Sequence, residues 1–187
     1  MQPGRAKATL SVGKALGFYY RASLLPVILT IIVGFFVGYF AGSLLGAVPG
    51  GIGIPFGAAA GAVAGLIAAV LGALFLLVAV PIGMLVDALI YQLFAKFVFG
   101  IWKGTYERTF TAVTYGMMPM LLFFWIAFIP FVDLLLIVIA LWSLAVFIVS
   151  LGRQHRIGVW RAFGGVVLTW IAAIVITAAV RFALFLL

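Results

Sequence analysis

The longest charge-free stretch of the chain lies between Arg21 and Asp87. A helix that crosses a hydrocarbon core of roughly 30 Å needs about 20 mostly apolar residues, so this stretch is too long for a single membrane span. Glycine and proline are concentrated in its middle, over residues 47–55, and both residue types favour a turn. The stretch therefore predicts a hairpin of two transmembrane helices, one over residues 24–46 and the other over residues 57–80.

Composition places the whole chain in the membrane class. Of its 187 residues, 68% are hydrophobic and only 7% are charged, whereas about a quarter of the residues in soluble domains are charged. A water-soluble fold could not cover its surface with so few charges. The basic residues outnumber the acidic ones, but they flank apolar segments and do not form a basic soluble face. We therefore expect no binding to nucleic acid, and we expect the lipid bilayer to be the main partner.

Charge spacing marks further helices in the second half of the chain. We expect three more membrane helices, over residues 109–129, 131–151 and 162–180. An N-terminal amphipathic helix around Lys7–Tyr20, within a cytoplasmic and interfacial segment 1–21, is predicted to lie among the headgroups, and a second amphipathic helix is predicted over residues 82–99 after Pro81. The sequence thus predicts an all-α integral membrane protein, a single domain over residues 1–187, with five transmembrane helices.

The basic residues indicate how the chain is oriented. With five spans, all lysines and arginines except Arg181 fall in segments that share one side of the membrane. Short loops rich in Lys and Arg face the cytoplasm, so we predict a cell-membrane protein with a cytoplasmic N-terminus and an extracytoplasmic C-terminus. The cations at the ends of the later spans are candidates for binding anionic lipid headgroups. These candidates are Lys103, Arg108, Arg153, Arg156 and Arg161.

Glycines recur every four residues on both sides of the predicted turn. The first series is Gly34, Gly38, Gly42 and Gly46, and the second is Gly57, Gly61 and Gly65. Each series lines one face of a helix, and faces of small residues let two helix backbones approach closely in lipid. This glycine-zipper pattern predicts helix packing, either between spans one and two of the same chain or between the subunits of a homo-oligomer.

Few residues could support catalysis. The chain has no cysteine and its only histidine is His155, so cysteine sites and sites of several imidazoles are excluded. It also has no Gly-x-Ser-x-Gly nucleophile motif and no phosphate-binding Gly-x-x-x-x-Gly-Lys loop. We therefore expect no catalytic, cofactor-binding or metal site, and we interpret the chain as a non-enzymatic protein.

Asp87 leaves one alternative open. If the second span ends near Pro81, this carboxylate lies at the inner interface as part of a solvated polar face. If the helix continues to Lys96, Asp87 lies about 13 Å deeper than that residue, near the middle of the membrane. A carboxylate at that depth costs at least about 2.5 kcal/mol and marks a functional candidate. The alternative function is therefore a small channel or transporter, with glycine-lined helices or Asp87 in the pathway.

Short motifs in the second half of the chain resemble those of a known family. They are Gly104-Thr105-Tyr106-Glu107-Arg108-Thr109-Phe110, Tyr115-Gly116-Met117-Met118-Pro119, Ile129-Pro130-Phe131 and Leu151-Gly152-Arg153-Gln154-His155-Arg156. This order resembles the Yip (Ypt-interacting protein) family pattern of a glycine-rich cytoplasmic turn, a Tyr-x-x-x-Pro element, an Ile-Pro turn and an inner loop with a histidine. The family-motif residues carried over are Tyr115, Gly116 and Pro119.

The resemblance implies a five-span protein with its N-terminus in the cytosol. Eukaryotic relatives are associated with small GTPases and vesicle traffic through a long N-terminal region with an Asp-Leu-Tyr-Gly-Pro element. This sequence lacks that element, so it is similar to a short prokaryotic member and we do not expect GTPase binding. The predicted function is a membrane scaffold or adaptor whose partners are anionic lipids and either a second membrane protein or further copies of itself.

Overall fold

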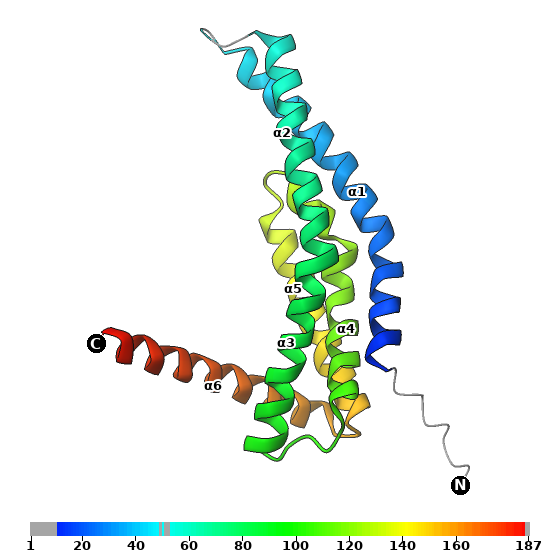
Figure 1. Cartoon of the computed structure of the whole chain (residues 1–187), viewed down its shortest axis with the longest axis vertical. Helices are drawn as coiled ribbons and strands as arrows, with labels where there is room; N and C mark the ends of the chain where they lie inside the picture. Colours follow the sequence, from blue (N-terminus) through cyan, green and yellow to red (C-terminus); the bar gives the residue numbers. More distant parts are fainter. Residues whose placement is uncertain (1–10, 49, 51–52, 186–187) are drawn as a thin grey trace. The chain divides into compact units, whose positions relative to one another are not determined.

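The protein is mostly helical in the part that the computed structural model describes, which is residues 11–48, 50 and 53–185. Those residues contain no strand. The elements shown in Figure 1 are α1 (Val12–Gly46), α2 (Ile54–Leu74), η1 (Phe75–Ala79), α3 (Val80–Gln92), η2 (Leu93–Val98), α4 (Tyr106–Leu122), η3 (Phe124–Phe128), α5 (Asp133–Gln154) and α6 (Val159–Phe185). Here η1 and η2 are π-helical and η3 is a 3₁₀ helix.

Four helical segments are long and apolar enough to cross a membrane. They are Val12–Gly46, Ile54–Val98, Asp133–Gln154 and Val159–Phe182. These segments fit a multi-pass membrane protein. The segment around the predicted third span is not among the four, because α4 has only 17 residues before its α-helical structure ends at Leu122.

The chain divides into two compact units. Among the described residues, the hairpin unit consists of those within 17–82 and 117–143, and the loop unit consists of those within 11–16, 83–116 and 144–185. The hairpin unit contains most of α1 and α2. The loop unit contains most of α3, all of η2 and α6, the first part of α4, the last part of α5 and the basic segments that connect them.

In the hairpin unit, α1 and α2 contact each other through their glycine faces. A Cβ atom placed on Gly34 would lie 2.6 Å from the Cβ of Ala69, and one placed on Gly38 would overlap the backbone of Gly61 and Gly65. Equivalent overlaps occur for Gly42, Gly46 and Gly57. The two backbones are therefore too close to admit a side chain, and the glycines described here meet within one chain.

The second helix of the hairpin is longer than the sequence predicts. Helical structure continues from Ile54 to Val98 without the expected break at Pro81. The π-helical turn η1 lies just before this proline, and in it the N–H of Val80 donates to the carbonyl of Phe75, five residues earlier. In this register each carbonyl accepts from the N–H five residues on, so the carbonyl that lacks a backbone donor because of Pro81 is that of Leu76, and the O–H of Tyr19 donates to it instead. All residues of the predicted second amphipathic helix except Phe99 therefore belong to this long helical segment, which ends at Val98.

The N-terminal amphipathic helix also differs from the expectation. Its first residues, including Lys7, lie outside the described part of the chain. From Val12 onward, the predicted interfacial residues form the beginning of α1, which continues without a break to Gly46. The phenolic O–H of Tyr19 donates to the carbonyl of Leu76 at 2.5 Å, so this end of α1 is joined to η1 within the hairpin unit.

The third predicted span, residues 109–129, is interrupted near its middle. Pro119 lies inside α4, and the N–H of Met120 donates to the Oγ of Ser143 at 3.1 Å. After α4 ends, the chain continues as a turn and the short 3₁₀ helix η3. A proline removes one backbone donor and crowds the turn before it, and α4 ends within one turn after Pro119, at Leu122.

The close contact between α1 and α2 predicts how glycine substitutions affect stability. We expect Gly38→Ala to lower the thermal unfolding midpoint, since overpacking typically costs about 1–3 kcal/mol. The measurement is loss of helical circular dichroism on heating in lipid nanodiscs.

Gly17→Ala is the matched control in the same helix, because a Cβ atom at Gly17 meets nothing within 4 Å. It should leave the midpoint unchanged or raise it slightly, since alanine favours helix more than glycine does. Equal midpoints for the two variants would contradict the packing described here.

Candidate functional site

His155 belongs to a closed ring of hydrogen bonds in the loop unit. The N–H of Gly104 donates to His155 Nδ1 at 3.1 Å, and His155 Nε2 lies 3.1 Å from Thr109 Oγ1. The hydroxyl of Thr109 donates to Gln92 Oε1 at 2.5 Å, and Gln92 Nε2 donates to the carbonyl of Gly104 at 3.0 Å. Because Nδ1 accepts a hydrogen bond, a neutral imidazole carries its proton on Nε2 and donates to Thr109. Each group therefore donates to the next around the ring.

The environment of His155 favours its neutral form. The side chain is only 3% exposed. Burial, together with the positive charges of Arg108 and Lys96, lowers the pKa of His155 to about 4. Protonation would also place a hydrogen on Nδ1, where the N–H of Gly104 already points. The imidazole is thus a neutral structural group within a strongly basic segment.

The lowered pKa of His155 links stability to pH. The unfolded chain, with a His pKa near 6.5, binds the proton more tightly than the folded protein does. We therefore expect the contribution of His155 to be complete above pH 6.5 and to be lost as the pH falls from 6.5 toward 4. The total loss is at most roughly 3 kcal/mol.

The segment before Gly104 places Trp102 against the ring. After η2, the N–H groups of Ile101 and Trp102 both reach the carbonyl of Ala95, at 2.8 and 3.2 Å, and Gly100 adopts a positive φ of 63°. The buried Trp102 indole lies 5.0 Å from the His155 imidazole, centroid to centroid. An aromatic wall therefore covers one side of His155.

The turn after α5 places the next basic residue. The N–H of Ile157 donates to the carbonyl of Gly152 at 2.9 Å, and the N–H of Arg156 reaches the carbonyl of Arg153 at 3.4 Å. These two bonds form the Schellman motif that ends many helices, in which the left-handed position is usually glycine. Here that position is Arg156, with a φ of 54°. The chain thus carries an arginine where glycine is conformationally favoured.

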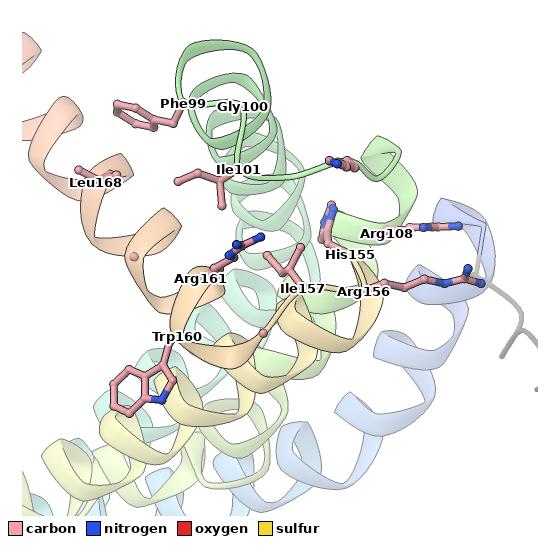
Figure 2. Close-up of a pocket in the computed structure, with 13 residues that line it drawn as sticks. Phe99, Gly100, Ile101, Arg108, His155, Arg156, Ile157, Trp160, Arg161 and Leu168 are labelled. Carbon is pink, nitrogen blue, oxygen red and sulfur yellow. The ribbon is translucent and has the colours of Figure 1, made fainter.

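The two connecting segments of the loop unit border a pocket of about 770 Å³. Figure 2 shows Arg161 extending from α6 toward Ile157, while Arg108 and Arg156 extend in one direction on the other side of His155. Four lysine and arginine side chains line the pocket together with His155, and they are Lys103, Arg108, Arg156 and Arg161. None of the described residues that line it is acidic.

The structure thus gathers four of the five predicted headgroup-binding residues around one pocket. The fifth, Arg153, lies exposed in the last turn of α5 and does not line it. The family-motif residues lie on α4, where Pro119 and Gly116 are buried and a Cβ on Gly116 would lie 2.6 Å from the Cβ of Phe147. Asp87 lies exposed on α3.

The polar residues of the membrane helices bear on the channel alternative. The hydroxyls of Ser43, Thr114, Thr169 and Thr177 each donate to a backbone carbonyl four residues earlier in their own helix. Such bonds satisfy a hydroxyl locally and leave it little capacity to guide a solute. The buried Thr30 Oγ1 has no hydrogen-bond partner among the described residues.

Sequence reasoning missed the residues that build the ring. Gln92, Thr109 and His155 are separated by 17 and 46 positions. Thr109 and His155 fall within the quoted motifs, but nothing in those motifs indicates that the two side chains meet, and Gln92 lies outside them. His155 stands between Gln154 and Arg156 in a basic segment, which suggests exposure to solvent. Only the three-dimensional arrangement reveals that it is buried.

Comparison of the chain with protein-family models, with curated proteins and with solved structures finds no match. The function therefore has to be inferred from the ring and the pocket themselves. The ring is electrically neutral and its hydrogen bonds are satisfied within it. The pocket beside it gathers positive side chains.

The ring predicts the effect of removing a single hydroxyl. We expect Thr109→Val to lower the thermal midpoint at pH 7, because it leaves buried groups of His155 and Gln92 unpaired, at a cost of roughly 1–3 kcal/mol. The measurement is thermal unfolding followed by tryptophan fluorescence.

Thr177→Val is the matched control, since Thr177 is exposed on α6 and bonds only to the carbonyl of Ala173. Its midpoint should stay near that of the unsubstituted protein. If Thr109→Val is as stable as Thr177→Val, the ring does not hold the loop unit together.

Proposed function

We propose that the protein is a non-enzymatic scaffold or adaptor of a cell membrane that acts on anionic lipid headgroups through its basic connecting segments. The observation that carries this proposal is the gathering of Lys103, Arg108, Arg156 and Arg161 around one pocket whose described lining has no acidic residue. A Yip-like organisation is part of the proposal and rests on the sequence motifs alone.

The position of these segments supports contact with headgroups. Residues 99–105 follow the apolar segment Ile54–Val98, and residues 155–158 join Asp133–Gln154 to Val159–Phe182. Segments that connect transmembrane helices lie at the level of the headgroups. Trp160, which is 84% exposed beside the pocket, is of the residue type that is enriched at the membrane interface.

The hydrogen-bond ring supports a common side for these segments. It joins Gln92 at the end of α3, Thr109 in the first turn of α4 and His155 after α5. This is the arrangement expected if α4 is a short fifth crossing and the neighbouring spans alternate in direction. The excess of Lys and Arg at these ends then favours a cytoplasmic location for them and for the N-terminus.

The free energy of the proposed interaction can be estimated from the charges of the basic residues. Each Lys or Arg near an anionic membrane surface contributes about 1 kcal/mol, and the attraction falls off within a Debye length of about 8 Å at physiological ionic strength. Several such residues on one face would enrich anionic lipid around the protein. The enrichment should weaken as salt concentration rises.

The test is the lipid composition around the protein. After reconstitution into vesicles of equal parts phosphatidylcholine and phosphatidylglycerol, the protein is extracted in polymer-bounded discs and the lipids are quantified by mass spectrometry. We expect phosphatidylglycerol to be enriched over the bulk vesicle, and expect alanine at all five basic positions to abolish the enrichment.

Arg181→Ala is the control, because this cation lies near the other end of α6 and should leave the enrichment unchanged. Discs with the bulk lipid composition for the unsubstituted protein would exclude the proposed function.

A further inference from the structure

We infer that the basic pocket holds the phosphate group of one anionic glycerophospholipid, whose acyl chains lie along the apolar surface of α6. The inference rests on the proposed function, which requires only a general preference for anionic lipid. It adds a defined site that binds one lipid molecule, formed by residues 99–108 and 155–168 of the loop unit.

The first reason is uncompensated positive charge. Lys103, Arg156 and Arg161 are exposed side chains around the pocket, and its described lining offers no carboxylate to pair with them. The first turn of α6 contains no acidic residue either. The first N–H groups of a helix lack partners within the helix and carry partial positive charge, so this end of α6 adds to the field. An anion is the group that this environment lacks.

The second reason is that two of the arginines occupy positions that local structure disfavours. Arg156 adopts the left-handed conformation, which strains residues other than glycine. Arg161 lies in the first turn of α6, where a cation opposes the helix dipole. Neither position improves the stability of its own turn. Strained or unfavourable residues at a pocket indicate that the side chain is kept for what it binds.

The third reason concerns the choice between a lipid and a soluble anion. The pocket lining is apolar on its other side, where Phe99, Ile101 and Leu168 contribute. Leu168 lies on α6, and this helix continues with the exposed Ile171, Ile174 and Val175. A site that binds only free phosphate does not require an apolar helix surface next to the pocket. Polar and apolar walls together match the head and the chains of one phospholipid.

The ring around His155 gives this pocket a fixed floor. Both imidazole nitrogens are engaged, by Gly104 and Thr109, so His155 has no free donor to offer the lipid. Its role is to hold the connecting segments, and the phosphate is bound by the arginine and lysine side chains. Arg156, which is exposed and extends away from Arg161 in Figure 2, turns toward the pocket when the lipid binds. Charge-assisted hydrogen bonds from arginine to phosphate are about twice as strong as neutral ones.

The experiment measures binding of short-chain phosphatidylglycerol to the full-length protein in neutral detergent by native mass spectrometry. We expect one saturable molecule per chain. Arg161→Ala and Arg156→Gly should each weaken the binding roughly tenfold or more, as expected for loss of a charge-assisted hydrogen bond. Arg153→Ala, which removes an equal charge outside the pocket from the same basic segment, should change the affinity less than about twofold.

Arg156→Gly also separates binding from folding. Glycine is the preferred residue at this left-handed position, so the variant should unfold at the same temperature as the unsubstituted protein or higher. Weak binding by a protein that is at least as stable would assign the loss to the missing guanidinium. Undiminished binding by this variant and by Arg161→Ala would overturn the site.

Two further outcomes distinguish the inference from the proposed function. If phosphatidylglycerol is enriched in the discs, yet Arg153→Ala weakens binding as much as Arg161→Ala, the proposed function stands and the defined site is wrong.

The last measurement is competition between the bound lipid and inorganic phosphate or glycerol phosphate. Displacement of the lipid by either at an equal concentration would show that the acyl chains contribute nothing and would overturn the assignment to a lipid, whereas failure to displace it supports the assignment.

Discussion

The ring of hydrogen bonds around His155 is the interaction on which the organisation of the loop unit depends. It joins α3, the segment after η2, the start of α4 and the turn after α5. Its members are buried, and a buried polar group that loses its partner costs far more free energy than the bond contributes net of solvation. A closed ring is therefore stable only when it is complete.

The ring also explains how a basic pocket can form where cations repel one another. Holding Gly104 and His155 together fixes the two connecting segments, which carry Lys103 and Arg156, next to the first turn of α4, which carries Arg108. Because the pKa of His155 is lowered by burial and by neighbouring cations, the histidine adds no charge of its own at neutral pH. The positive field comes from the arginines and lysines. One of them, Arg156, adopts a left-handed backbone conformation that lowers the stability of the folded protein.

The sequence predicts the parts of this structure that depend on composition and short-range spacing. Apolar length and charge spacing indicate the membrane helices, and the four-residue glycine interval places glycines on one helix face. The continuation of the helix past Pro81 could not be predicted, since it depends on the π-turn before the proline. The burial of His155 could not be predicted either, because its partners Gln92 and Thr109 come from distant positions in the chain. Long-range polar contacts leave no periodic signal.

The most direct test of this account is ¹⁵N NMR of the imidazole as a function of pH in lipid nanodiscs, which is unambiguous because the chain has one histidine. The account predicts a neutral His155 imidazole that is protonated at Nε2 and accepts a hydrogen bond at Nδ1. This imidazole should begin to titrate only as the pH approaches about 4. An imidazole that titrates near pH 6.5, or one protonated at Nδ1 when neutral, would contradict the closed ring.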